Sequence, residues 1–235
     1  MGKGKEKEIV NYLNGKRYKD LCPVWQSLCK EINPQVVPND EVIAEEIAGN
    51  FKADLKIKIG DKEACLSAKD GSGNSVHQEP LPEFLRFCKE QLSASQEVLE
   101  EIRWFICERK DARKLYKEKP YVFDKLNDFF EKHLKILLER FLVTGLYVEN
   151  TADYIYYGKV EEGVYTELRS AIEVITNNKK DKKLHPYLKK RNHIYIGPLT
   201  FQAWGRTSKK NRGNIQIKWG KIKENIEYIN KLKGK

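Results

Sequence analysis

The sequence has no long apolar run and no paired cysteines, and each absence excludes a class of protein. No stretch of about 18 apolar residues occurs, so we expect no helix that spans a membrane. The start of the chain, MGKGKEKE, has no apolar signal region, which favours a cytoplasmic location. The five cysteines form no Cys-x-x-Cys pair, so we expect no zinc site and predict reduced thiols.

The glycine-rich segment at residues 70–75, DGSGNS, lacks the Gly-Lys-Ser or Gly-Lys-Thr ending of a nucleotide-binding P-loop. We therefore expect no nucleotide cofactor. Two interpretations of the segment stay open. It is either a plain surface turn or a loop whose backbone donors approach a phosphate group closely.

Acidic residues are fewer than basic ones, with 34 Asp and Glu against 44 Lys and Arg, which gives a formal net charge of +10. A balance of this kind favours a polyanionic partner, although an ordinary basic protein has it too. The length of 235 residues fits one sizeable domain, and 40% hydrophobic with 33% charged residues is typical of a globular protein.

Two short patterns with a period of two predict a β-hairpin. Apolar and polar residues alternate over residues 55–59, LKIKI, and again over residues 62–69, KEACLSAK. Between them lie Gly60 and Asp61, which are typical of a tight two-residue turn. The segment therefore reads as two antiparallel strands with one apolar face and one polar face.

The register of this hairpin decides which side chains meet. With the two turn residues in place, Leu55 lies opposite Leu66. One residue further from the turn, Asp54 lies opposite Ser67 on the other face. Lys69 follows two residues later and shares the face of Ser67. The sequence thus predicts that Asp54, Ser67 and Lys69 gather at one end of the polar face.

A carboxylate and an ammonium group in this arrangement suit metal-dependent hydrolysis of a phosphodiester. The carboxylate of Asp54 would hold Mg²⁺, which neutralises the phosphate and lowers the pKa of a bound water. Lys69 would steady the attacking water or the developing negative charge. One carboxylate makes a poor magnesium site, so a second is needed. Glu79 and Glu83 are the nearest candidates downstream of the second strand.

This pattern resembles the PD-(D/E)XK nuclease superfamily, which includes many type II restriction endonucleases. The resemblance is carried by Ala53-Asp54 and Ser67-Ala68-Lys69 and covers residues 41–92. Ala53 stands in place of the proline, which has no chemical role, and Ser67 stands in place of the acidic residue. The resemblance implies a mixed α/β fold: a restriction-endonuclease-like core of a central mixed sheet flanked by helices. It also implies Mg²⁺ as cofactor and double-stranded DNA as substrate.

The resemblance also implies roles for individual residues. Some members with a serine in the triplet draw the second carboxylate from a later helix or loop, which Glu79 or Glu83 would supply here. Ser67 would support the site by hydrogen bonding, and Gln78 would orient Lys69 or touch the substrate. The catalytic residues that we expect are Asp54, Lys69, Glu79, Ser67, Gln78 and Glu46, with Asp54 and Glu79 as metal ligands and Glu83 as the alternative to Glu79.

Glu46 enters this set through the segment before the first strand. Residues 41–48 are expected to form a helix that is capped by residues 38–40 and ended by Gly49-Asn50. Members of the superfamily often have an acidic residue on the helix in this place, and Glu45 and Glu46 match it. Glu46 either leans toward the site or is solvated on the helix face.

The rest of the chain reads as helices followed by a C-terminal β-hairpin. Helices are expected over residues 5–33 (interrupted at Gly15), 82–92, 94–108, 121–143, 165–176 and 221–235, and strands over 193–202 and 214–219. We expect a single nuclease domain, residues 1–235. Its parts would be a catalytic core (about 38–110), a helical insertion (about 111–143) and a DNA-recognition part (about 144–235).

The connection between the last two strands, AWGRTSKKNRG, mixes four basic residues with Trp204. Such a mixture suits nucleic acid, because cations bind phosphates, arginine binds guanine edges and aromatic rings stack. A β-ribbon also fits the major groove. The alternative is a solvated hairpin loop. The residues that we expect to contact DNA are Ser72, Asn74, His77, Arg206, Lys209, Lys210 and Arg212.

The leading interpretation is a magnesium-dependent endonuclease for double-stranded DNA, of the type II restriction kind. Cutting both strands usually takes two active sites, so a homodimer is expected. Three alternatives stay open. They are a repair or recombination nuclease such as a junction resolvase, a catalytically inactive DNA-binding protein on the same core, and a protein directed at RNA.

Overall fold

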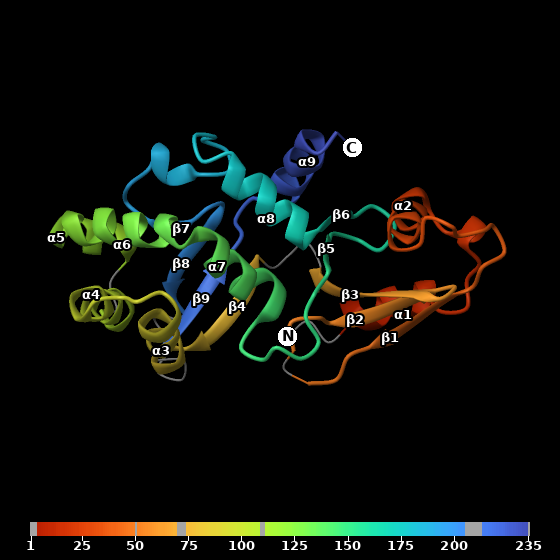
Figure 1. Cartoon of the computed structure of the whole chain (residues 1–235), viewed down its shortest axis with the longest axis horizontal. Helices are drawn as coiled ribbons and strands as arrows, with labels where there is room; N and C mark the ends of the chain where they lie inside the picture. Colours follow the sequence, from red (N-terminus) through yellow and green to blue (C-terminus); the bar gives the residue numbers. More distant parts are fainter. Residues whose placement is uncertain (1–3, 50, 70–73, 109–110, 205–212, 235) are drawn as a thin grey trace. The chain divides into compact units, whose positions relative to one another are not determined.

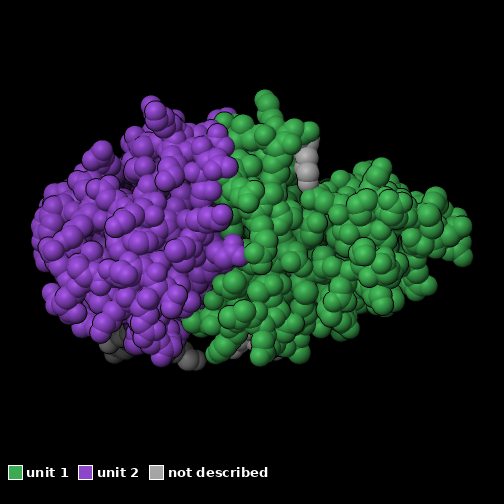
Figure 2. Space-filling view, in the orientation of Figure 1, with its two compact units in different colours: residues 1–74, 142–174, 222–235 green, residues 75–141, 175–221 purple. Residues whose placement is uncertain are grey.

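The computed structural model describes residues 4–49, 51–69, 74–108, 111–204 and 213–234. The chain forms two compact units, which Figure 2 draws in different colours. Unit 1 consists of residues 1–74, 142–174 and 222–235, and unit 2 of residues 75–141 and 175–221. The units are interleaved in the sequence, because each is assembled from segments that are not consecutive.

Unit 1 is built on a five-stranded mixed sheet in the order β1-β2-β3-β5-β6 (Figure 1). The strands are β1 (Val42–Glu46), β2 (Leu55–Ile59), β3 (Lys62–Lys69), β5 (Tyr154–Tyr157) and β6 (Val164–Glu167). Neighbouring strands run antiparallel, except that β3 and β5 are parallel. The expected hairpin is confirmed as β2 and β3, and β3 is the central strand of the sheet.

Helices α1 (Lys5–Leu13) and α2 (Pro23–Ile32) share one hydrophobic core with the apolar face of this sheet. A short 3₁₀ turn, Tyr18–Asp20, lies between them. In that core, Trp25 of α2 stacks on Tyr156 of β5, with ring centroids 4.4 Å apart. Helix α9 (Ile222–Leu232) contacts β6. Helix α8 (Leu168–Asn177) follows β6 in the chain. The two helices expected within residues 5–33 and the C-terminal helix are therefore confirmed.

The helix expected over residues 41–48 is wrong, because this segment forms strand β1. Its backbone pairs antiparallel with β2, with Val42 opposite Ile59 and Glu46 opposite Leu55. Val42 and Ala44 are buried, and Ile43 between them is exposed. The β-branched pair Val42-Ile43 suits a pleated edge strand, and pairing with the hairpin outweighs the helical pattern.

Unit 2 is built on a four-stranded antiparallel sheet in the order β4-β9-β8-β7 (Figure 1). The strands are β4 (Ser75–Pro80), β7 (Ile194–Ile196), β8 (Leu199–Ala203) and β9 (Asn214–Lys218). The C-terminal hairpin is confirmed as β8 and β9. Strand β4 was not expected, and the strand expected over 193–202 is split by a turn at Gly197, whose φ is +54°.

Most helices of unit 2 lie between β4 and residue 142, where the chain returns to unit 1. They are α3 (Leu81–Gln91), α4 (Gln96–Cys107), α5 (Ala112–Glu118), α6 (Pro120–Lys132) and α7 (Leu134–Leu138), and a 3₁₀ turn occurs at Pro186–Leu188. Phe201 of β8 packs against Phe84, Phe105 and Phe130 of α3, α4 and α6, with centroids 5.3, 5.8 and 5.1 Å away. An aromatic core therefore covers one face of the sheet.

The long helix expected over residues 121–143 is interrupted. Helix α6 ends at Lys132, α7 follows, and Glu139–Thr144 forms a π-helical segment. Within the described ranges, no helix is both long and apolar enough to cross a bilayer.

Candidate active site

The β2–β3 hairpin brings Asp54 and Lys69 together as the sequence predicts. Leu55 pairs with Leu66, and Ile59 pairs with Lys62 across the turn. Gly60 has a φ of +61°, a conformation that favours glycine. Asp54, next to Leu55, links the two strands through its side chain. Its carboxylate accepts a hydrogen bond from the backbone N–H of Ala68 at 2.7 Å.

Three donors converge on a single oxygen of Asp54. Its Oδ2 accepts from the Ser67 hydroxyl (3.1 Å), from the Ala68 N–H (2.7 Å) and from the Lys69 ammonium (3.0 Å). Lys69 also donates to the Ala68 carbonyl oxygen at 3.0 Å. The side chains of Lys69 and Asp54 are 21% and 24% exposed. The cluster is therefore ordered by hydrogen bonds, yet it is open to solvent at the end of the strand.

A second lysine lies beside this cluster. Lys52 is buried, two residues before Asp54 in the chain. Burial, reinforced by the positive charge of Lys69 and partly offset by Asp54, lowers the pKa of Lys52 to about 7. The sequence did not single out Lys52, since a lysine before a strand reads as a solvated residue.

The oxygen atoms of the cluster fit a hard cation. They are the Asp54 carboxylate and the Ala68 carbonyl oxygen, which both accept a hydrogen bond from the Lys69 ammonium. In proteins Mg²⁺ is often held by one or two carboxylates, with water and substrate phosphate completing its six ligands. Among the described residues, no group of three or more His, Cys, Asp or Glu residues has a metal-binding arrangement. The cluster therefore offers one carboxylate for a cation, rather than the two that the sequence analysis expects.

Glu79, expected as the second metal ligand, lies in unit 2, where its carboxylate already has partners. It binds Arg140 through both oxygens, with Nε–Oε1 at 3.1 Å and Nη2–Oε2 at 2.5 Å. Nε2 of His77 lies 3.3 Å from Oε1. Burial would raise the pKa of Glu79, but the hydrogen bonds and charges of His77 and Arg140 outweigh it and lower the pKa. This pairing gives Glu79 a structural role that competes with metal binding.

The other expected catalytic residues lie on other elements and have other partners. Glu46 lies on β1 rather than on a helix, and within the described residues it pairs with neither Asp54 nor Lys69. Glu83, the alternative ligand, is in α3 of unit 2 and pairs with Arg86. Gln78 is exposed on β4 of unit 2, where it donates to the Ser75 hydroxyl at 3.1 Å.

The residues expected to contact DNA fall into three groups. His77 is buried, and its ring packs against Phe141 with centroids 5.1 Å apart. Asn74 is half-buried just before β4. Ser72 and the four basic residues of the β8–β9 connection lie outside the described residues: Arg206, Lys209, Lys210 and Arg212.

The fold is similar to that of a known endonuclease. None of the protein-family models matches the sequence, and none of the curated proteins does. Among solved structures, the chain is similar to the restriction endonuclease MspI in complex with its cognate DNA, with a TM-score of 0.59 and 16% sequence identity. The match covers 92% of this chain and 88% of that chain. The predicted fold class, a restriction-endonuclease-like mixed α/β fold, is thereby confirmed.

Proposed function

We propose that this chain is a magnesium-dependent endonuclease that hydrolyses phosphodiester bonds of double-stranded DNA at a specific sequence. The observation that carries the proposal is the 3.0 Å pairing of Asp54 with Lys69 at the solvent-open end of β3. The likeness to an endonuclease that was solved with its cognate DNA supports DNA as the partner. The net charge of +10 suits a polyanion.

In this mechanism the residues of the hairpin have separate tasks. Asp54 and the Ala68 carbonyl oxygen would hold Mg²⁺, which would supply charge neutralisation at the phosphate and lower the pKa of a bound water. Ser67 would fix Asp54 through its hydrogen bond. Lys69 stabilises the negative charge that develops on the phosphate, or steadies the attacking water. Hydrolysis forms a bond from the water oxygen to phosphorus and breaks the bond to the 3′ oxygen, which leaves a 5′-phosphate.

The sequence analysis expected Glu79 to complete the ligands of Mg²⁺, and we assign these ligands differently. If Glu79 left Arg140 for a metal ion, a guanidinium whose side chain is 15% exposed would lose both of its carboxylate bonds. Breaking a buried ion pair in this way costs several kcal/mol. We therefore assign Glu79 to the support of unit 2, and water and phosphate oxygens to the remaining positions of the cation.

Each chain carries one Asp54–Lys69 cluster. Cleavage of both strands usually takes two active sites, so we propose that the active form is a homodimer. Sedimentation of the protein with and without duplex DNA measures this directly. A monomer that cuts both strands of one site would overturn the dimer without affecting the assignment of the cluster.

The test of the activity is digestion of plasmid DNA with Mg²⁺. The wild-type protein is expected to give discrete fragments. Lys69→Ala is expected to lower the cleavage rate about 10²–10³-fold, as the loss of one transition-state donor does elsewhere. Asp54→Ala is expected to lower it at least as much, and both variants should still bind DNA.

Lys56→Ala is the matched control. Lys56 lies on the neighbouring strand β2 of the same sheet, and its ammonium approaches Glu45 and Glu63 rather than Asp54. Removing this charge is expected to leave the cleavage rate within about twofold, since surface ion pairs contribute little. Binding of DNA without cleavage by the wild type would overturn the proposal in favour of an inactive DNA-binding protein. Cleavage of branched DNA alone would favour a junction resolvase.

A further inference from the structure

The sheet of unit 2 has a polar face that carries three glutamines in register. Gln78 of β4 pairs with Gln216 of β9, and Gln202 of β8 pairs with Gln216 from the other side. Two residues further along β9 and β8, on the same face, Lys218 pairs with Thr200. The opposite face of β8 carries Phe201 and the aromatic core. The row therefore runs across three adjacent strands, about 4.8 Å from one to the next.

Hydrogen bonds fix the amides of this row. Gln202 Nε2 donates to Gln216 Oε1 at 2.8 Å, and Gln216 Nε2 donates to the Ser75 hydroxyl at 3.2 Å. Gln78 Nε2 donates to the same hydroxyl at 3.1 Å. Ser75 accepts twice, so its own proton remains available to a further acceptor. Among the described residues, no hydrogen bond reaches the carbonyl oxygen or the second N–H of Gln202, which form a paired acceptor and donor.

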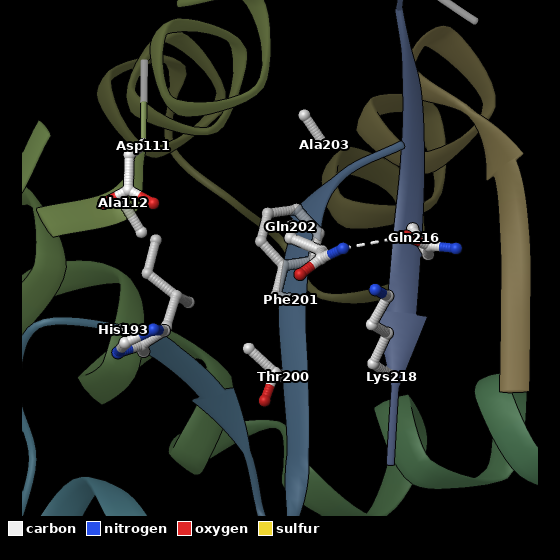
Figure 3. Close-up of a pocket in the computed structure, with 10 residues that line it drawn as sticks. Asp111, Ala112, His193, Thr200, Phe201, Gln202, Ala203, Gln216 and Lys218 are labelled. Atoms are coloured by element: carbon white, nitrogen blue, oxygen red, sulfur yellow. Dashed lines mark hydrogen bonds between the residues drawn. The ribbon is translucent and has the colours of Figure 1, made fainter. Parts of the chain in front are cut away.

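The polar row borders an open hollow (Figure 3). The hollow has a volume of about 290 Å³, and its lining residues include Gln202, Gln216, Thr200, Lys218 and His193. In Figure 3 the Gln202 and Lys218 side chains come from adjacent strands and lie at the same side of the hollow. The lining thus offers amides, a hydroxyl and an ammonium, together with the carboxylate of Asp111, within one unit of the chain.

We infer that this polar face reads DNA bases, with Gln202 and Lys218 as the residues that determine the recognised sequence. An amide oxygen and an amide N–H side by side match the N6 and N7 atoms of adenine in the major groove, and lysine matches O6 and N7 of guanine. The inference rests on the proposed function, because it names the surface by which the endonuclease would select its site.

Base edges suit this face better than phosphates do. Phosphate binding depends on positive charge, whereas the row consists of neutral amides and hydroxyls with Lys218 as its lysine. Neutral groups that are both donor and acceptor discriminate between bases but add little to the attraction of the backbone. The hydrogen-bonded row is also ordered in advance, which lowers the cost of fixing side chains on binding.

The test is selection of duplexes from a randomised DNA library. The starting protein is the full chain with Lys69→Ala, so that bound DNA is not cut, and it is compared with the same protein carrying Gln202→Leu or Lys218→Met. Each added substitution is expected to reduce the preference at one position of the selected sequence about ten- to a hundredfold. The other positions should keep their preference.

Gln91→Leu and Lys89→Met are matched controls, because both residues are exposed on α3 of the same unit. They remove the same groups and the same charge, and the selected sequence should not change. Gln202→Glu keeps the shape of the side chain, replaces its donors by an acceptor and adds a negative charge, so a shift in preference at one position with this variant does not depend on repacking. Thermal unfolding of each variant verifies that it is folded.

The outcomes separate this inference from the proposed function. A changed preference at one position supports both. An unchanged selected sequence in Gln202→Leu, Gln202→Glu and Lys218→Met overturns the inference while the endonuclease assignment stands. A uniform loss of affinity in Lys218→Met, with a shallower salt dependence, would show a phosphate contact and overturn its role in reading bases. Failure of the starting protein to select any sequence overturns both.

Discussion

Two acid–base pairs, one in each sheet, differ in what their surroundings allow them to do. Asp54 and Lys69 lie at the end of β3 with side chains 24% and 21% exposed. Glu79 and Arg140 lie in unit 2 with side chains 0% and 15% exposed. Each pair joins a carboxylate to a long basic side chain. Sequence motifs alone do not distinguish a reactive pair of this kind from a structural one.

The distinguishing property is spare bonding capacity. The three donors of the first cluster all bind Oδ2 of Asp54, and within the described residues its Oδ1 accepts no hydrogen bond. Both oxygens of Glu79 are used by Arg140. A carboxylate with a free oxygen near solvent can accept a cation without losing its partners, whereas a buried and fully bonded one cannot. Asp54 is therefore suited to chemistry and Glu79 to support.

The sharpest test of this contrast is Glu79→Ala. The substitution leaves Arg140 without its carboxylate, so we expect the free energy of unfolding to fall by about 3–5 kcal/mol. Denaturation by urea measures this change. The cleavage rate per folded molecule should stay close to that of the wild type, because Glu79 has no part in the hydrolysis that we propose.

Glu83→Ala provides the comparison for that experiment. The Glu83 side chain is 38% exposed and pairs with Arg86 one turn along the same helix, so its loss should change the free energy of unfolding by at most about 1 kcal/mol. The contrast would break if Glu79→Ala kept its stability and lost cleavage. That result would make Glu79 the second metal ligand, as the family resemblance implies.

A smaller effect is expected from Lys52, through the pH dependence of stability. Its pKa is lowered to about 7 in the folded chain, against about 10.4 for an unfolded lysine. Between these values the unfolded state binds more protons, so this group makes stability rise with pH. The rise should be about 2 kcal/mol between pH 7 and pH 9. Urea denaturation with EDTA at several pH values measures it.

Lys52→Met isolates the contribution of this one group. It keeps an unbranched side chain of similar length and removes the charge, so the difference between the two unfolding curves reports Lys52 alone. The variant should be more stable than the wild type at pH 7, and the difference should shrink toward pH 9. Parallel curves for the two proteins would mean that Lys52 is solvated in solution and does not feel the Asp54–Lys69 cluster.

Local patterns predicted the parts of the fold that depend on neighbouring residues. The β2–β3 register follows from alternation and from Gly60, and it brought Asp54 and Lys69 together without any knowledge of the rest of the chain. The helix predicted over residues 41–48 was wrong, because the pairing of this segment with β2 is a tertiary effect that outweighs a helical pattern of apolar residues. The break between α6 and α7 has no signal in the sequence, since the apolar stripe continues through it.

Contacts between residues far apart in the sequence could not be predicted. Arg140 is 61 residues from Glu79 in the chain, and nothing in the sequence links them. The polar row of unit 2 depends on the order β4-β9-β8, which joins residues far apart in the sequence. The sequence analysis singled out Gln78, but it predicted that Gln78 lies near Lys69. Only the sheet topology shows that Gln78 lies beside Gln216. Pairing across long loops, rather than residue type, therefore limits what the sequence reveals.

The smallest expected effect is that of Ser67→Ala, which tests whether the order of the first cluster matters for catalysis. Ser67 is buried and gives Asp54 one of its three hydrogen bonds, at 3.1 Å. Losing one such bond is worth about 1 kcal/mol, so we expect the cleavage rate at saturating DNA to fall about fivefold. Binding of DNA should not change, because the hydroxyl faces the carboxylate. Single-turnover kinetics and a binding titration separate the two effects. A loss as large as that of Asp54→Ala would mean that Ser67 holds the cation directly, and an unchanged rate would mean that the Ala68 N–H and Lys69 fix Asp54 without it.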